Sequence, residues 1–494
     1  MSLVSETRFP LFAAPEQHSL PADNPSVAEA RWSRRIIGAA SAAYFLLASL
    51  RYAFFRAGVL DLGYFDQGVY LISRGLPTFI PTLGYPIFAD HGAYILYPLA
   101  LLYVIYPSVL WLLAAQSLAL AGSAWFLWRL ARQAGVMPRW ALIVCAAWLV
   151  YPAVVMSNLQ DFHPEVLAVP ALLGAVLYAR DRQPIPFAIC LVIALGTREV
   201  IALTVAAMGL WLFLSEKNRR YGLAALVISA VWFVVVTHIL IPLVGQGHQF
   251  NGYRFFGYLG KTPGEILRTI LLHPLTPLRF VLSKATAIYL AVLIAPVWWG
   301  LRPRHLTPLL GATPSIAINL LSQDGNLHNP FFHSSLAIAP FVFLAVISAL
   351  AARGAWLPRL WMVGGWIALI TIGGAAFRDS QARAETSSGE TSRTERQALV
   401  DMVGDTGGVL STFQLTSHLM HREMAYYVFN PADKPDMHLP PPSAFDWVVL
   451  DFHEPSLIET GTFGRAILRQ YQANPKFIQL QAGNGLYLFH RIAK

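Results

Sequence analysis

Long apolar segments alternate with short polar ones from residue 36 to residue 376. A transmembrane helix needs about 20 mostly apolar residues, because each adds about 1.5 Å across about 30 Å of hydrocarbon. The pattern predicts eleven transmembrane helices, at 36–55, 108–129, 139–157, 164–180, 185–197, 200–214, 221–242, 280–299, 305–321, 334–352 and 358–376. The run 93–106 is apolar but short and ends at Pro107, so we expect it to be re-entrant or interfacial.

The apolar stretch 185–214 is interrupted by Thr197, Arg198 and Glu199. A charged side chain at the bilayer centre costs about 2.5–3.5 kcal/mol on insertion scales. We therefore expect two short helices that meet at a polar turn rather than one long helix.

Basic residues alternate with acidic and histidine-bearing loops along the predicted helices. Cytoplasmic loops of membrane proteins carry an excess of Lys and Arg. With the N-terminus inside, the cytoplasmic segments contain Arg31, Arg34, Arg35, Arg129, Arg132, Arg139, Arg180, Arg182, Lys217, Arg219, Arg220, Arg302, Arg304, Arg353 and Arg359. The acids and histidines then lie on the extracytoplasmic side of a multi-pass protein of the cell membrane.

The composition changes after Phe377, where residues 378–396 are rich in Ser, Thr, Glu and Arg. Short β-like runs follow at 409–413, 425–429, 446–451, 477–481 and 486–490, with helical patterns at 395–404, 415–422 and 462–473. We expect a small extracytoplasmic α/β domain over 378–494. The other expected parts are a disordered cytoplasmic tail, 1–35, and a transmembrane domain, 36–377.

The overall composition supports a membrane protein. Only 13% of the 494 residues are charged, against about 25% in soluble domains. The net charge of +9 comes from scattered residues, which excludes a nucleic-acid interface. The two cysteines, Cys145 and Cys190, lie in apolar runs and exclude a disulfide framework and a cysteine metal site.

The first extracytoplasmic loop carries Asp61 and Asp66, with Gln67 beside the second. A carboxylate near the membrane surface can deprotonate an acceptor hydroxyl or bind a cation. The alternative is a pair of ordinary solvated loop acids.

Asp161, His163 and Glu165 lie in a tight turn between two predicted helices. Carboxylate and imidazole both suit Mn²⁺ or Zn²⁺, so Asp161 and His163 are candidate metal ligands. A divalent metal ion, Mg²⁺ or Mn²⁺, is the candidate cofactor. The alternative is a capping turn with Asp161 as the N-cap and Pro164 at the first helical position.

Basic residues that suit an anionic ligand lie in three other polar segments. Arg198 offers paired donors to a phosphate, or it forms a structural ion pair with Glu199. The residues expected to bind substrate or phosphate are Arg198, Glu199, His91, Arg254, Lys261, His333 and His163. Arg254 and Lys261 lie in the loop 243–279, which suits a lid over an anionic, sugar-bearing ligand, or forms an interfacial aromatic belt.

The order of these motifs resembles that of the GT-C glycosyltransferases, which are polytopic enzymes that use polyprenyl-phosphate sugars on the outer face of the membrane. It is most similar to the predicted membrane protein family called domain of unknown function 2079. This resemblance covers roughly residues 45–490 and is carried by Asp61–Gln67, Asp90–Pro98 with His91, Asp161–Pro164, Arg198–Glu199 and the loop with His328 and His333.

The resemblance implies a GT-C-like fold in which Asp66 is the catalytic base or an acceptor-binding acid and Arg198 faces the lipid phosphate. The sequence departs from the superfamily at two positions. Gln67 follows Asp66 where relatives have paired acids, and His91 stands where many have lysine.

The predicted function is transfer of a sugar, with inversion, from a polyprenyl-phosphate donor to a glycan, lipid or protein acceptor, with Asp66 as base. A transporter or flippase for a lipid-linked or anionic solute is the alternative, and a structural envelope protein is the third. Clustering of the ionisable residues at one face favours the enzyme, because transporters often place them near the midplane.

Overall fold

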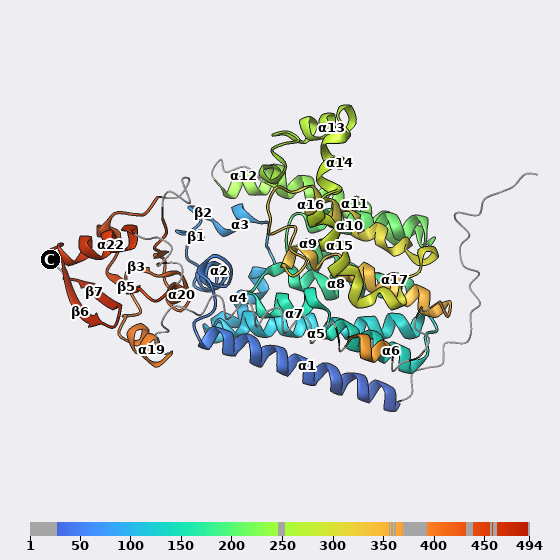
Figure 1. Cartoon of the computed structure of the whole chain (residues 1–494), viewed down its shortest axis with the longest axis horizontal. Helices are drawn as coiled ribbons and strands as arrows, with labels where there is room; N and C mark the ends of the chain where they lie inside the picture. Colours follow the sequence, from blue (N-terminus) through green and yellow to red (C-terminus); the bar gives the residue numbers. More distant parts are fainter. Residues whose placement is uncertain are drawn as a thin grey trace, which may run out of the picture.

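The computed structural model has a helical body and a smaller sheet domain, which lie at opposite ends of the long axis (Figure 1). It describes residues 27–245, 252–354, 393–430, 438–454 and 462–492, with a few positions between 356 and 369 and Leu457. Residues 1–26 of the expected tail, most of the eleventh predicted span 358–376 and residues 378–392 of the expected linker lie outside the described residues.

The body is built from helices that follow the apolar runs of the sequence. Its N-terminal half contains α1 (Val27–Ala53), the π-helical turn η1 (Val59–Gly63), α2 (Tyr64–Ser73), α3 (Ile87–Asp90), α4 (Leu96–Ile105), α5 (Leu110–Gln133), α6 (Pro138–Leu149), α7 (Pro152–Leu159), η2 (Pro164–Leu167) and α8 (Ala168–Arg180). The short strands β1 (Phe79–Ile80) and β2 (Tyr85–Pro86) form an antiparallel pair between α2 and α3.

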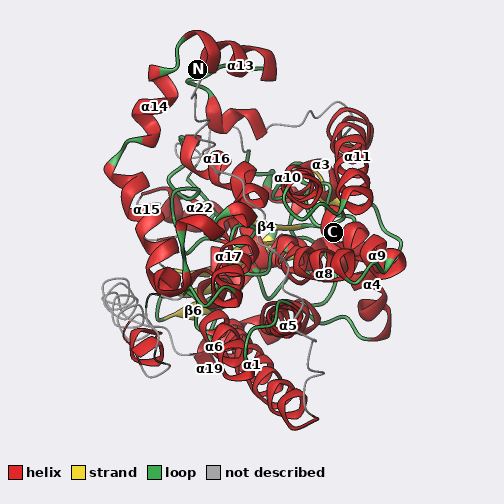
Figure 2. Ribbon diagram, turned by 90° about the vertical axis from the view of Figure 1, so that its right-hand side faces the viewer, coloured by secondary structure: helices red, strands yellow, loops and turns green. Residues whose placement is uncertain are grey.

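The second half contains α9 (Pro184–Leu195), α10 (Ile201–Leu214), α11 (Arg219–Val235), η3 (Val236–Leu240), α12 (Ile241–Val244), η4 (Gly252–Phe256), α13 (Pro263–Leu272), α14 (Leu275–Val281), α15 (Lys284–Ile294), η5 (Ala295–Gly300), η6 (Pro303–His305), η7 (Thr307–Ala312), α16 (Thr313–Leu321), η8 (His333–Ser335) and α17 (Ala339–Ala351). Figure 2 views α5, α8 and α10 nearly along their axes in the middle of the body.

Within the described residues, four helices are long and apolar enough to cross a membrane: Glu29–Ala53, Leu110–Gln133, Arg219–Val244 and His333–Ala351. Two bent pairs, Pro138–Leu149 with Pro152–Leu159 and Leu275–Val281 with Lys284–Gly300, raise this number to six. The remaining apolar helices are shorter, so the count of eleven spans stays a prediction. The break between α9 and α10 confirms the expected pair of short helices.

The helix α4 has ten residues. At about 1.5 Å per residue it reaches about half of the hydrocarbon thickness. Leu101, Val104 and Ile105 on it are at least 60% exposed, which suits contact with lipid. The expected re-entrant or interfacial role fits this length.

Two glycines bring α10 and α11 into backbone contact. A Cβ added to Gly209 would lie 2.7 Å from the carbonyl oxygen of Gly222, and one added to Gly222 would lie 2.6 Å from that of Gly209. Real Cβ atoms do not approach an oxygen this closely, so a side chain at either position would separate the helices.

The sheet domain has five strands in the order β4-β3-β5-β7-β6. The strands are β3 (Val409–Ser411), β4 (Ala425–Tyr427), β5 (Trp447–Asp451), β6 (Phe477–Gly483) and β7 (Leu486–Arg491). β3 is parallel to both β4 and β5, whereas β7 is antiparallel to β5 and β6. Each strand overlaps one predicted β-like run, so a mixed α/β domain is confirmed in outline.

The helices of this domain are α19 (Arg393–Asp401), α20 (Phe413–Thr416), η9 (Pro442–Ala444) and α22 (Thr462–Gln472). The expected helix over 415–422 is wrong, because α20 ends at Thr416. The chain beyond it turns to contact the helical body, where the Ser417 hydroxyl donates to the carbonyl of Ala57. These tertiary contacts outweigh the local helical pattern.

Candidate active site

The first loop is held in a tight conformation between α1 and α2. Phe55 adopts a positive φ of 56°, and Gly58 is extended before the π-helical turn η1. Asp61 lies in η1, and Asp66 lies in the first turn of α2. The two acids therefore occupy different elements and face different surroundings.

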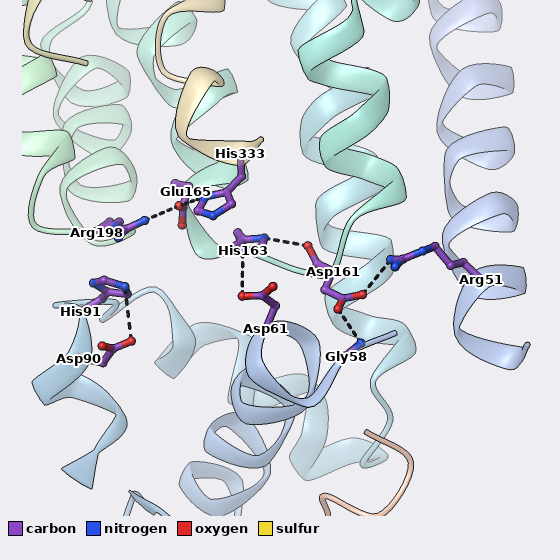
Figure 3. A network of polar contacts seen from close by, with 10 residues as sticks. All are labelled: Arg51, Gly58, Asp61, Asp90, His91, Asp161, His163, Glu165, Arg198 and His333. Carbon is purple, nitrogen blue, oxygen red and sulfur yellow. Dashed lines mark hydrogen bonds and ion pairs between the residues drawn. The ribbon is translucent and has the colours of Figure 1, made fainter. Parts of the chain in front are cut away.

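Asp161 anchors this loop from the turn between α7 and η2. Its Oδ2 accepts a hydrogen bond of 2.6 Å from the Gly58 amide, and its Oδ1 accepts one of 2.9 Å from Arg51 Nη1 (Figure 3). The N-cap of η2 is His163, so the expectation that Asp161 caps this helix is wrong, whereas Pro164 begins η2 as expected. Asp161 instead joins α1 and the first loop to the turn between α7 and η2.

His163 links this anchor to Asp61. The backbone carbonyl of Asp161 lies 2.8 Å from His163 Nδ1. A carbonyl only accepts, so Nδ1 carries the proton and Nε2 faces Asp61 Oδ1 at 3.2 Å. The Asp61 side chain is 42% exposed, whereas that of His163 is 5% exposed.

The pKa shifts of the two partners agree on their charges. Burial lowers the pKa of His163, but the negative charge of Asp61 outweighs it, so the pKa is raised. Loss of surrounding water raises the pKa of Asp61, but the charge and hydrogen of His163 outweigh it, so that pKa is lowered. Both shifts favour an ionised Asp61 carboxylate beside a protonated His163.

A second set of contacts continues the network on the other side of His163. The rings of His163 and His333 are stacked with centroids 3.6 Å apart. His333 Nδ1 lies 2.5 Å from Glu165 Oε1, which also accepts a hydrogen bond of 2.9 Å from Arg198 Nη1. The buried Nε of Arg198 has no hydrogen-bond partner among the described residues.

The third part of the network surrounds His91. Its Nε2 lies 3.4 Å from Asp90 Oδ2, and its Nδ1 lies 3.5 Å from Glu199 Oε1. Burial and Arg198 lower the pKa of His91, but Asp90 and Glu199 outweigh them and raise it. Of the two alternatives for Arg198, a phosphate contact or a structural pair with Glu199, the structure shows an ion pair, but with Glu165; Glu199 contacts His91 instead.

These contacts bring residues from five separate loops to one face of the body. The network joins Arg51, Asp61, Asp90, His91, Asp161, His163, Glu165, Arg198, Glu199 and His333. Its acids outnumber its guanidinium groups, so protonation of His91 and His163 brings the site close to charge balance.

Two predicted phosphate-binding residues lie outside this contact network. Arg254 is in η4, with its guanidinium 4.8 Å from the Phe255 ring centroid. It is within electrostatic reach of Tyr85, whose hydroxyl donates to Asp90 over 3.0 Å. Lys261 precedes α13, and its backbone amide donates to Glu265.

Asp66 is placed away from the network and is 2% exposed. The Tyr103 hydroxyl donates to its Oδ1 over 2.6 Å, and His421 Nε2 of the sheet domain lies 3.1 Å from the same oxygen. These contacts occupy Asp66 at the junction of the two domains. The structure therefore separates the two acids that the sequence placed in one loop.

The expected metal ligands do not fit a metal ion in this arrangement. Both carboxylate oxygens of Asp161 are bound by Gly58 and Arg51, and His163 Nδ1 donates to a backbone carbonyl. Across the described part of the chain, no group of three His, Cys, Asp or Glu side chains is arranged to hold a metal.

Sequence reasoning missed three residues of the site and its surroundings: Arg51, Tyr103 and His421. Arg51 looks like a basic residue at the end of a transmembrane helix, and Tyr103 like a lipid-facing aromatic residue. His421 is 355 residues from its partner Asp66. Its signal in the sequence is the pair of histidines, His418 and His421, within the helical pattern 415–422.

The apolar helices and the polar network at their ends define a membrane protein whose loops form a buried cluster of ion pairs and hydrogen bonds. The family described as "Predicted membrane protein (DUF2079)" matches residues 51–488, so the chain belongs to this family. The family resemblance inferred from the motifs is thereby confirmed.

Among solved structures, the chain is similar to ArnT from Cupriavidus metallidurans. The apo state is 11% identical with a TM-score of 0.47, covering 91% of this chain and 98% of that one. The state bound to undecaprenyl phosphate is 12% identical with a TM-score of 0.45, covering 94% and 98%. Comparison with curated proteins gave no match.

Proposed function

We propose that the protein is a membrane glycosyltransferase that uses a polyprenyl-phosphate sugar and has Asp61 as its general base. The observation that carries this proposal is the Asp61 carboxylate, which is accessible and lies 3.2 Å from Nε2 of His163. A general base must reach the hydroxyl that it deprotonates and must be unprotonated at the working pH. The exposure of Asp61 and its lowered pKa support both requirements.

This assignment moves the base from Asp66 to Asp61. Asp66 is 2% exposed, and Tyr103 and His421 both contact its Oδ1, so it is less accessible to an acceptor hydroxyl than Asp61. Asp61 faces the polar loops that converge on His163. Both acids remain functional candidates, with different roles.

The reaction proceeds by one displacement at the anomeric carbon. The acceptor oxygen forms the new bond to this carbon as its proton passes to Asp61. The bond from carbon to the phosphate oxygen breaks, polyprenyl phosphate leaves with the electron pair, and the configuration inverts. Positive groups fixed near the leaving oxygen lower the barrier, because charge develops there.

Arg198 is the first candidate for this positive group. One donor is bound to Glu165, but its Nε has no partner in the described part of the chain and its side chain is 20% exposed. His91, Arg254 and Lys261 are further candidates. The acceptor is a glycan, lipid or protein.

The first test is turnover of polyprenyl-phosphate sugars by the purified protein. We expect Asp61→Asn to reduce kcat by about 10²–10⁴-fold, as for loss of a general base. Asp66→Asn is expected to lose no more than about tenfold, because an amide oxygen still accepts from Tyr103. Asp181→Asn, at the residue directly after α8, serves as the matched control.

The three variants distinguish the enzyme from the transporter. Donor binding by all of them, with release of polyprenyl phosphate lost only in Asp61→Asn, supports the proposal. Donor binding without turnover in wild type across glycan, lipid and protein acceptors would favour a transporter or flippase. Full turnover by Asp61→Asn would remove Asp61 from the mechanism.

We also propose that the N-terminus is cytoplasmic and that the sheet domain is extracytoplasmic. The distribution of Arg and Lys supports this orientation. A reporter enzyme that is active only outside the cytoplasm, fused after Lys494, should be active in whole cells. The same reporter fused before Met1 should be inactive.

A further inference from the structure

The segment that follows β3 connects the sheet domain to the first loop. We call Thr412–Glu423 the docking segment. The ring of Phe413 packs so closely on Gly58 that a Cβ added there would lie 2.6 Å from it. Ser417 Oγ donates to the Ala57 carbonyl over 3.3 Å, and the His418 ring stacks on Tyr52 with centroids 4.0 Å apart.

The far end of the docking segment contacts α2. His421 Nε2 lies 3.1 Å from Asp66 Oδ1, and its ring stacks on Tyr70 with centroids 4.8 Å apart. Gln67 Nε2 donates to the Arg422 carbonyl over 2.9 Å. Phe55 and Val59 of the first loop belong to the same apolar core as the strands of the sheet domain.

The docking segment is itself held firmly within the sheet domain. The buried Glu454 lies three residues beyond the end of β5. It accepts hydrogen bonds from Thr412 Oγ1, Gln414 N and Leu415 N at 2.6, 2.8 and 3.0 Å. The guanidinium of Arg422 donates to backbone carbonyls of the same domain. Movement of the sheet domain therefore carries the docking segment with it.

Gly58 is contacted by both the helical body and the sheet domain. Asp161 accepts its amide proton, while Phe413 covers its α-carbon. Asp61 follows three residues later, inside the single turn of η1, and Asp66 follows at the start of α2. The turn that carries Asp61 is thus fixed at its start by Gly58 and at its end by the contact of His421 with Asp66.

We propose that the sheet domain is a positioning element for Asp61, and that Phe413 and His421 are its positioning residues. Asp61 would otherwise sit on a loop with a half-exposed side chain and one ion-pair partner. A displacement of about 1 Å in a reacting group can reduce a rate by about a hundredfold. The effect on turnover rests on the proposed function, whereas the effect on the loop does not.

The experiment compares Phe413→Ala and His421→Ala in the full-length protein by hydrogen–deuterium exchange and by turnover. The matched control is His438→Ala, an exposed histidine of the same domain. Amide exchange over residues 57–67 should be at least about tenfold faster in the two docking variants than in wild type or the control. Exchange within α5 and α17 should be unchanged.

Turnover gives the second readout. We expect kcat to fall by about ten- to a hundredfold in the docking variants while KM for the donor changes less than about twofold. His421→Gln should recover part of this loss, because its amide can still donate to Asp66.

The outcomes separate this proposal from the proposed function. Unchanged exchange over 57–67 in both docking variants overturns the positioning role. Faster exchange with unchanged kcat overturns its catalytic part. Loss of turnover in Asp61→Asn with both docking variants fully active leaves the transferase intact and refutes only the catalytic part of the positioning role. If wild type lacks transferase activity, the exchange data alone decide whether the sheet domain holds the loop.

Discussion

Asp61 and His163 are 102 residues apart in the sequence and meet as an ion pair, with Asp61 Oδ1 3.2 Å from His163 Nε2. The proton on His163 Nδ1 is held by the Asp161 carbonyl, so the imidazole presents its other nitrogen to Asp61. The pair turns one of two neighbouring loop acids into an oriented, ionised carboxylate. Its charge state provides direct tests.

The first prediction concerns the pH dependence of turnover in His163→Gln. His163 lowers the pKa of Asp61, so its removal should raise that pKa. The acidic limb of kcat/KM, which reports the base in the free enzyme, should therefore move to higher pH. Rates measured between about pH 4 and 9 in wild type, His163→Gln and His438→Gln test this. An acidic limb that stays in place in His163→Gln would show that His163 does not act on the base.

The second prediction concerns stability. The lowered pKa of Asp61 contributes stability that is present above its ordinary value of about 3.9 and is lost as pH falls through the lowered value. The raised pKa of His163 contributes stability that is present below about 6.5 and is lost as pH rises through the raised value.

Asp61→Asn should therefore reduce Tm most between about pH 4 and 6.5, where both contributions are present. Thermal unfolding in detergent at several pH values measures this difference. A deficit that increases steadily toward pH 9 would contradict the assigned charges.

The third prediction concerns the anchor of the first loop. Asp161→Asn removes the charge that binds Arg51 and weakens the acceptor for the Gly58 amide. We expect a loss of about 1–3 kcal/mol in the free energy of unfolding, at the lower end because Arg51 is 27% exposed. Asp181→Asn, whose ion pair with Arg129 is 3.8 Å long, should change stability by less than about 0.5 kcal/mol. Equal effects of the two substitutions would rule out a special role for Asp161.

The fourth prediction concerns the contact of Gly58 with Phe413. In Gly58→Ala the new methyl group overlaps the ring, which should cost about 1–3 kcal/mol. Combination with Phe413→Ala should be less destabilising than the sum of the two changes, because the smaller side chain makes room. Gly38→Ala, with no atom within 4 Å of the added Cβ, should be neutral or stabilising. Additive effects would show that there is no steric conflict between the side chain at position 58 and the Phe413 ring.

Much of the fold follows from patterns of neighbouring residues. The apolar runs located the helices, and the β-like runs near Val409, Ala425, Trp447, Phe477 and Leu486 each contain a strand. These features depend on local periodicity and turn residues, which the sequence displays directly. The polar turn at Thr197–Glu199 was predictable for the same reason.

The division of roles between Asp61 and Asp66 was not predictable in this way. Both are acids in one glycine-containing loop, and their environments are set by His163 and by His421, which are 102 and 355 residues away. The local sequence carries no information on which partner each acid meets. The pairing of Arg198 with Glu165 instead of Glu199 has the same origin, because the turn directs adjacent side chains in different directions.

Arg51 lies in the last turn of α1, which is also a candidate membrane span. The helix that meets the lipid thus carries the cation that holds Asp161 and, through Gly58, the start of η1. Lipids with longer or shorter acyl chains change the tilt of such a helix. We therefore expect the position of Arg51, and of the first loop that it holds through Asp161, to depend on the thickness of the bilayer, so that the surrounding membrane acts mechanically on the site.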